Sequence, residues 1–189
     1  MGDPRKGRKK YTSPGHPYQK ARLENELIII GKYGLRNKKE LWRARTKLAN
    51  YRSQARSLLG LESDTRIERE KLLIDKLNRL GIISVETEID DVLSLEVETI
   101  LKRRLQTQVL EKGLAGTIYQ ARQLITHRHI MVQGRIMTSP SYIVPVASEN
   151  DIAYASTSPF GDEAHTMNAS LSRESTILEI PEKKIMRRR

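Results

Sequence analysis

The sequence contains no cysteine, which excludes disulfide bonds and thiolate ligands for zinc. Aromatic residues make up only 5% of the chain, with one Trp and one Phe, so a core must consist mostly of Leu, Ile and Val. Apolar runs are far too short to span a bilayer, and the basic first residues lack a following apolar region. We therefore expect a cytoplasmic protein with no membrane-spanning segment and no secretory signal.

Positive charge, in contrast, is abundant. Lys and Arg number 34 against 23 Asp and Glu, and the net charge of +11 indicates an acidic partner, either nucleic acid or an anionic membrane. Residues 1–57 hold sixteen basic residues and four acids, so almost the whole excess lies in the first third. A chain of 189 residues has room for one or two small domains and not for a large catalytic core.

The first twenty residues combine Pro, Gly and basic side chains with almost no apolar ones. Such a segment cannot bury enough surface to fold alone, so we expect an extended arm that becomes ordered against a polyanion. The alternative is a tail that only adds solubility. The expected binding residues of the arm are Arg5, Lys6, Arg8, Lys9, Lys10, Tyr11 and Lys20.

A helical region is expected over residues 21–100. Apolar spacing predicts helices over 19–33 and 37–60, the second opened by an Asn37 cap with Glu40 three residues on. From 41 to 60 the charged side chains are all basic, whereas a face kept only for solubility would interleave Glu. The alternative of a merely solvated face is thus less favoured, and we predict phosphate contacts from Arg22, Arg43, Lys47, Arg52 and Arg56.

A third helix is predicted from Ser63 or Asp64 to a stop at Gly81, and its mixed charges indicate a solvated or protein-facing surface. Its expected buried residues are Ile67, Ile74, Leu77 and Leu80. An acidic patch follows, in which Asp90 and Asp91 lie side by side. We interpret this pair as the cap of a short turn at Val92, rather than as an acid–base pair or metal site.

Two short helices are predicted over residues 101–112 and 117–126. A four-residue apolar spacing predicts the first, and Gly113 supplies the left-handed residue that ends it. Thr117, followed by Gln120 three residues on, predicts the start of the second. The expected buried face of that second helix is Ile118, Ala121, Leu124 and Ile125.

After these helices the period of apolar residues changes to two, which predicts a β-hairpin from Ile130 with a turn at Gly134 and Arg135. Ser139-Pro140 breaks the second strand, and residues 142–146 offer a further extended segment. The predicted fold class is α+β, with a mostly helical basic front and a small helix–helix–hairpin module.

The run GLAGTIYQARQLITHRHIMVQGRIMTSPSYIV resembles the S-four RNA-binding domain, a compact helix–helix–hairpin module. The preceding RRLQT, the earlier YRSQARSLLGL and the opening GDPRKGRKKYTSPGHPY resemble the archaeal and eukaryotic form of the small-subunit ribosomal protein S-four family. The resemblance covers roughly residues 2 to 158. The family usually has glycine where Arg128 stands and asparagine where Gln133 stands.

The resemblance implies four segments and one partner. They are a basic arm over 1–20, a helical rRNA-binding region over 21–100, an S-four-like domain over 101–158 and a polar tail over 159–189. RNA helices hide their base edges, so a protein recognises phosphates, 2′-hydroxyls and shape. The S-four-like domain offers for this purpose Arg103, Arg104, Gln106, Thr107, Thr117, Gln120, Arg122, Gln123, His127, Arg128 and His129.

Some of these residues have an alternative role that does not involve RNA. Thr117 can cap its helix and accept a phosphate at the same helix end. His127 and His129 lack nearby His, Cys or carboxylate partners, so we expect no metal and no cofactor. In the tail, a strand over 176–180 and a second basic arm at 186–189 are the only patterns that we distinguish.

The resemblance implies a structural constituent of the small ribosomal subunit that takes part in translation and its accuracy. It would bind the 5′ region of small-subunit rRNA, nucleate assembly of the subunit body, adjoin other ribosomal proteins and line the channel through which mRNA enters. An RNA-modifying enzyme is less favoured, because few residues follow the module and no nucleophile with a partnered base appears. A free RNA chaperone is another alternative. No membrane partner and no small-molecule substrate are expected.

Binding to small-subunit rRNA should weaken steeply with salt, because each neutralised phosphate releases counterions. Replacing Arg43, Lys47 and Arg56 with Ala should lower the slope of log affinity against log salt by about two. Replacing Arg66, Arg69 and Lys71, which lie among acids, should change it little. Filter binding over a salt series measures both slopes, and a nearly flat dependence for the unsubstituted chain would contradict the electrostatic account.

Overall fold

The computed structural model describes residues 9–84 and 87–161. Seven α-helices and three strands lie in these ranges, which confirms the α+β class. The expected contact residues Arg5, Lys6 and Arg8, the predicted strand over 176–180 and the basic residues 187–189 lie outside them. The helices are α1 (Lys20–Lys32), α2 (Lys38–Leu59), α3 (Ser63–Arg79), α4 (Ile89–Ser94), α5 (Val97–Lys102), α6 (Leu105–Glu111) and α7 (Ile118–Thr126). The strands are β1 (Ile130–Val132), β2 (Arg135–Ile136) and β3 (Ile152–Tyr154), and the 3₁₀ helices are η1 (Val146–Ser148) and η2 (Pro159–Gly161).

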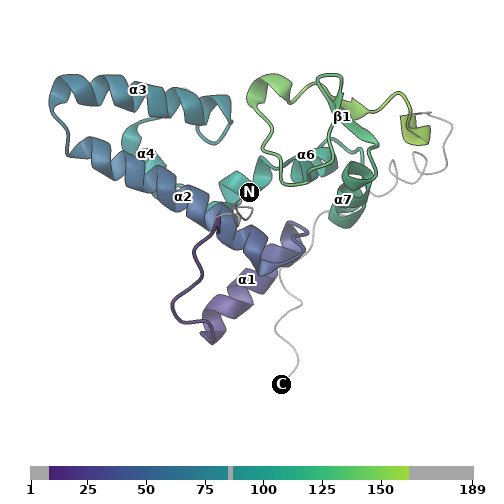
Figure 1. The fold of residues 1–189 in the computed structure, drawn as a ribbon, viewed down its shortest axis with the longest axis horizontal. Helices are drawn as coiled ribbons and strands as arrows, with labels where there is room; N and C mark the ends of the chain where they lie inside the picture. The colour runs from purple at the N-terminus through teal and green to yellow at the C-terminus, as the bar shows by residue number, and fades with distance from the viewer. Residues whose placement is uncertain (1–8, 85–86, 162–189) are drawn as a thin grey trace, which may run out of the picture.

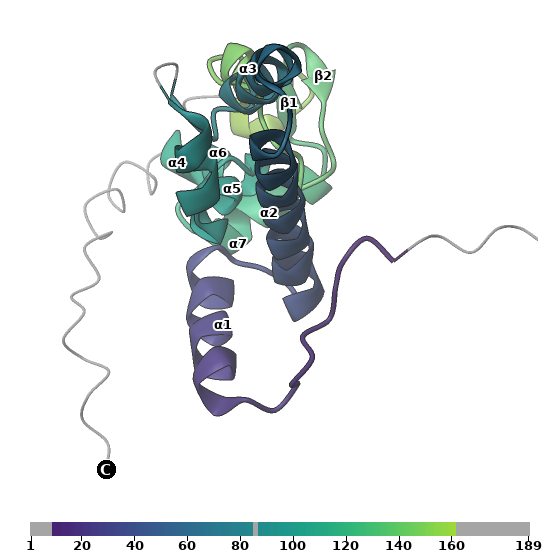
Figure 2. The same cartoon turned by 90° about the vertical axis from the view of Figure 1, so that its left-hand side faces the viewer.

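Helix α2 is the central element of the front part. In Figures 1 and 2 it extends from the side of α3 and α4 to the far end where α1 folds back. Asn37 caps it as predicted, since its side chain accepts a hydrogen bond from the Glu40 N–H at 3.1 Å. The predicted apolar face is confirmed too, because Leu41, Ala44, Leu48, Ala55 and Leu58 are buried.

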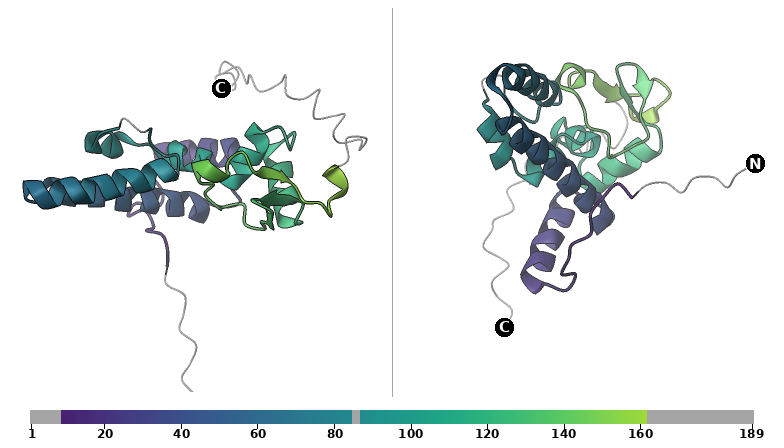
Figure 3. Two further views of the ribbon diagram at one scale, coloured as in Figure 1. Left: turned by 90° about the horizontal axis from the view of Figure 1, so that it is seen from above. Right: turned by 60° about the vertical axis from the view of Figure 1, so that its left-hand side comes forward.

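Two apolar cores lie next to each other. The first, which we call the helical unit, is formed by α1 to α5 and includes Leu48, Leu77 and Leu101. The second, which we call the small module, runs from α6 to η2 and includes Leu105 and Ile130. Seen from above in Figure 3, both parts lie in one shallow layer. The chain passes from one core to the other between Leu101 and Leu105.

Helix α3 differs from the sequence prediction in its contacts. Leu77 is buried and Gly81 has a positive φ of 66°, as expected for a helix stop. Ile67, however, is 66% exposed, and the side chain that joins Leu77 in the core is Leu73. Leu73 and Leu77 are four residues apart and share one stripe of the helix, while Ile67 lies off that stripe. The prediction for Ile67 is therefore wrong.

The acidic patch before α4 acts as a helix start. The helix begins at Ile89, and the Asp91 carboxylate accepts a hydrogen bond from the Glu88 N–H at 3.2 Å. The cap thus lies earlier than predicted, although Asp91 belongs to it. Within residues 9–84 and 87–161, no three metal-binding side chains gather at one place.

The predicted helix over 101–112 is broken near its start, since α5 ends at Lys102 and α6 begins at Leu105. Ile143 pairs with Arg104 in an isolated antiparallel bridge, and the Leu105 N–H donates to the Tyr142 carbonyl at 2.7 Å. This pairing with the extended segment pulls the backbone out of the helix between α5 and α6. Helix α7 agrees with the prediction, since Thr117 accepts a hydrogen bond from the Gln120 N–H at 3.2 Å.

The predicted hairpin is part of a three-stranded antiparallel sheet in the order β2-β1-β3. In the hairpin Val132 faces Arg135, so the turn consists of Gln133 and Gly134, one residue earlier than predicted. Strand β3 was not predicted, because three residues are too few to show a period of two. Together the strands close the small module over Ile130 and Ile152.

Two residues that depart from the resembling family occupy left-handed backbone. Arg128 has a φ of 68° and Gln133 a φ of 50°, and they are the non-glycine residues with positive φ in the described part of the chain. Glycine and asparagine adopt this conformation readily, whereas other L-residues lose about 1–2 kcal/mol. The conformation therefore explains why the family uses Gly and Asn at these positions.

No helix in the described ranges combines the length and the apolar character needed to cross a membrane.

Gly34→Ala should destabilise the protein by roughly 2–4 kcal/mol. Gly34 has a φ of +55°, and a Cβ built there would lie 2.8 Å from Ile118 Cγ1 and from Gln106 Nε2. The control is Gly31→Ala within α1, where a Cβ meets no atom within 4 Å and should stabilise the helix by about 0.5–1 kcal/mol. Urea unfolding measures both changes, and equal effects would contradict the steric account.

Candidate nucleic-acid interface

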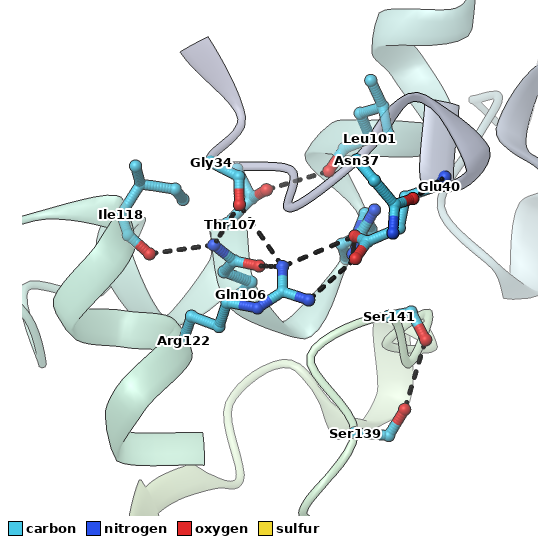
Figure 4. Close-up of polar contacts among 11 residues, drawn as sticks. Gly34, Asn37, Glu40, Leu101, Gln106, Thr107, Ile118, Arg122, Ser139 and Ser141 are labelled. Carbon is cyan, nitrogen blue, oxygen red and sulfur yellow. Dashed lines mark hydrogen bonds and ion pairs between the residues drawn. The ribbon is translucent and has the colours of Figure 1, made fainter. Parts of the chain in front are cut away.

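The helical unit and the small module are joined by a buried ion pair network. Glu40, in the first turn of α2, accepts a hydrogen bond from Arg104 Nη2 at 2.7 Å and one from Arg122 Nη2 at 2.7 Å. Arg104 is only 5% exposed. Figure 4 shows the Arg122 guanidinium between the Glu40 carboxylate and the Gln106 amide. Both arginines, expected to meet RNA phosphates, are thus neutralised inside the protein.

Gln106 is fully buried in the same network. Its Nε2 donates to the Gly34 carbonyl at 3.1 Å and to the Ile118 carbonyl at 2.9 Å, while its Oε1 accepts from Arg122 at 3.3 Å. Thr107 is buried as well and donates to the Leu101 carbonyl at 2.9 Å. The expectation that these two side chains face a partner is wrong, because all their polar atoms are used within the fold.

Arg103 has a similar internal role. Its guanidinium donates to the Leu80 carbonyl at 3.1 Å, to the Val144 carbonyl at 2.9 Å and to Glu149 at 2.8 Å. These contacts tie the end of α3 to the loop before η1. The structure therefore assigns Arg103, Arg104 and Arg122 to the connection between segments rather than to an outward surface.

The charge of Glu40 is maintained by its two partners. Burial alone would raise the pKa of this carboxyl, but the hydrogen bonds from Arg122 and Arg104, together with their charges, outweigh burial and hold the pKa below its ordinary value. Glu40 therefore stays ionised across the physiological range. The sequence offered a weak sign of this role, since Glu40 is the one acid between residues 27 and 61.

A second buried acid organises the basic front. Glu26 has no exposed surface, and its Oε1 accepts from Arg45 at 2.6 Å and lies 3.6 Å from Arg22 Nε. Lys38 Nζ lies 3.5 Å from Oε2, and Trp42 Nε1 donates to Oε1 at 3.4 Å. Glu26 thus holds α1 against α2, and Arg22 has an intramolecular partner.

The arm residues within the described range lie along α2. The Tyr11 and Trp42 rings are tilted against each other at 5.9 Å, and the Thr12 N–H donates to Thr46 Oγ1 at 3.0 Å. Lys9 and Lys10 are exposed beside this contact, and Lys20 is exposed at the start of α1. The arm therefore adds Lys9 and Lys10 to the surface of α2.

The cations that remain exposed on α2 are Lys39, Arg43, Lys47 and Arg56. Arg52 instead donates to the Leu95 carbonyl and fixes the link between α4 and α5. Partial burial, followed by the charges of Arg104 and Lys10, lowers the pKa of Lys47. No ion pair joins the four exposed cations to an acid in residues 9–84 and 87–161. They form an unbalanced positive surface, which is the property that a polyanion requires.

The small module presents mostly uncharged polar residues, together with Arg128. Thr117, Gln123, His127 and Arg128 are exposed, and Gln120, Gln123, His127 and His129 line a hollow beside Phe160. His129 Nδ1 lies 3.1 Å from Ser158 Oγ, and its ring meets Phe160 edge to face at 4.8 Å. Sequence reasoning missed Phe160 and Ser158, because their segment matched no pattern.

The fold and its unbalanced face define a protein built on an RNA-binding module. The S4 domain family matches residues 103–150 of the chain. Small ribosomal subunit protein uS4 of Sulfolobus acidocaldarius is 58% identical over 161 residues, which cover 85% of this chain and 92% of that protein. The uS4 protein of Ignicoccus hospitalis is 52% identical over 164 residues, covering 87% and 99%. The chain therefore belongs to the uS4 family, whose members are ribosomal structural proteins and are not known to be enzymes.

Glu40→Gln should lower the free energy of unfolding at neutral pH by roughly 3 kcal/mol, because the buried Arg104 and the partly buried Arg122 lose their counter-charge. The folded-state pKa of Glu40 is depressed, so its stabilisation is complete above its ordinary value of 4.5 and is lost as the pH falls through the folded pKa. As the pH falls through this acid range, the free energy of unfolding should therefore decrease less for Glu40→Gln than for the unsubstituted chain.

The matched control is Glu70→Gln, which breaks the more exposed Arg66–Glu70 pair at 3.4 Å and should cost less than about 1 kcal/mol. Urea unfolding over a pH series measures both variants. Equal destabilisation by the two changes would contradict the central role of Glu40.

Proposed function

We propose that the chain is a structural constituent of the small ribosomal subunit and binds small-subunit rRNA directly. The observation that carries this proposal is the exposed set Arg43, Lys47 and Arg56 on α2, which has no acid partner among the described residues. The arm brings Lys9 and Lys10 to the same surface. The relatives named above are proteins of the small ribosomal subunit, in which rRNA is the polyanion available for binding.

The helical unit and the small module contact RNA in different ways. Cations of the arm and α2 contact phosphates and supply most of the electrostatic attraction. The exposed polar side chains of the small module, Thr117, Gln123, His127 and Arg128, contact phosphates and 2′-hydroxyls where the RNA shape allows them to approach. The network around Glu40 keeps both surfaces in one arrangement, so binding needs no domain reorientation.

Finer parts of the role follow from the same proposal. We infer that the chain binds the 5′ region of the rRNA, nucleates assembly of the subunit body and lines the mRNA channel, where it supports accuracy. In this role it resides in cytoplasmic ribosomes. The outer side of α3, with Ile67 and Leu72 exposed between charged residues, suits contact with a neighbouring ribosomal protein.

Sedimentation tests the proposed role. The chain should remain with the small subunit through a high-salt wash, whereas a visiting RNA chaperone, the alternative, would be released. Arg43→Ala with Lys47→Ala and Arg56→Ala should reduce incorporation at least tenfold, since each lost phosphate contact weakens binding. The charge-matched control, Arg66→Ala with Arg69→Ala and Lys71→Ala, is measured in direct binding to the isolated rRNA, where its affinity should stay within about twofold while that of the α2 variant falls. Loss of the unsubstituted chain in the wash would contradict the proposal.

A further inference from the structure

A cavity lies where α2, α5 and the loop of residues 139–143 meet. Its volume is about 160 Å³, and it opens between the helical unit and the small module. In Figure 4 the Ser139–Ser141 loop lies across from the network of Glu40 and Arg122. The cavity is thus framed by both parts of the protein and by the junction that fixes their arrangement.

One wall of the cavity is apolar. Ala44, Ile100 and Leu101 are buried side chains of the helical unit, and Pro140 and Ile143 complete this wall from the loop. The junction residues Glu40, Arg104 and Arg122 line the other side. A cavity of about 150 Å³ can hold one benzene ring, so this space has room for a single six-membered ring against the apolar wall.

The mouth of the cavity is positively charged. Arg43 and Lys47 line it, and neither forms an ion pair with an acid in the described part of the chain. Arg104 also lines the cavity, and its buried Nε has no hydrogen-bond partner among residues 9–84 and 87–161. An unmatched buried donor and two unmatched cations around an apolar space indicate a ligand that is anionic at one end and flat and apolar at the other.

We propose that this cavity receives one unpaired pyrimidine nucleotide of the bound rRNA, with its base against the apolar wall and its phosphate at Arg43 and Lys47. The inference rests on the proposed rRNA binding and adds a specific subsite to it. Unpaired bases that leave an RNA helix are commonly held against apolar faces and guanidinium planes, and a pyrimidine matches the size of the space.

The test introduces bulk at the mouth without removing a charge. Ser141 is exposed and lines the cavity, so Ser141→Tyr should exclude the base. The control is Ser139→Tyr on the same loop, which does not line the cavity. Both changes remove the same Ser139–Ser141 hydrogen bond of 3.2 Å, so that loss cancels in the comparison.

Base-specific chemical probing of small-subunit rRNA with the full chain is the readout. The unsubstituted chain should protect an unpaired pyrimidine that becomes reactive again with Ser141→Tyr, and affinity should fall about tenfold. Ser139→Tyr should retain the protection and bind within twofold. Ser141→Tyr should leave the salt slope unchanged, whereas Arg43→Gln with Lys47→Gln should lower it.

Each contrary result has a separate meaning. If Ser141→Tyr binds rRNA with unchanged affinity and protections, the subsite is refuted while the proposed function stands. If only Arg43→Gln with Lys47→Gln weakens binding, the mouth holds a phosphate alone and the base subsite is refuted. If Ser141→Tyr instead weakens only association with ribosomal proteins, the occupant is a protein segment and the inference fails. Absence of rRNA binding by the unsubstituted chain would overturn the proposed function itself.

Discussion

The carboxylate of Glu40 determines how the two cores are placed. The Glu40 backbone N–H donates to the Asn37 side chain at the start of α2. The two carboxylate oxygens accept hydrogen bonds, one from Arg104 at the start of the small module and one from Arg122 within it. Apolar contacts alone are non-directional and would allow several ways of placing the cores. A buried ion network is a poor source of net stability, because desolvation offsets the attraction, but it penalises every arrangement that leaves a charge unpaired. The distance between the charged face and the polar module is therefore set by Glu40.

Internal ion pairs also explain why the exposed positive charge of this strongly basic protein is distributed unevenly over its surface. Glu40 and Glu149 form ion pairs with the arginines nearest the junction, and Glu26 forms ion pairs with those near α1. The exposed cations of α2, with Lys9 and Lys10 of the adjoining arm, form no ion pair with an acid in the described part of the chain. Acids placed inside the fold thus determine which cations are left for a partner, and the net charge of the chain alone does not show this.

The sequence predicted those features that depend on neighbours along the chain. The Asn37 and Thr117 caps, the buried stripe of α2 and the stop at Gly81 all follow from local spacing. The functions of Arg104 and Gln106 depend on contacts across the fold, since the Arg104–Glu40 pair joins residues 64 apart and Gln106 reaches Gly34 across 72. The sequence pattern of basic and amide residues on a short helix is the same whether their side chains contact solvent, RNA or a buried acid. For the same reason, β3 became visible only through its pairing with β1.

The approach of Lys10 and Arg104 to Lys47 has a consequence for the free protein. Partial burial of the Lys47 ammonium, followed by repulsion from these two cations, disfavours its charged form and lowers its pKa. A polyanion that binds only the folded chain offsets this cost and adds its own binding free energy to the stability of the fold. The chain is thus least stable when it is alone, which links its persistence in solution to the supply of its partner and leaves unassembled copies the most exposed to unfolding and proteolysis.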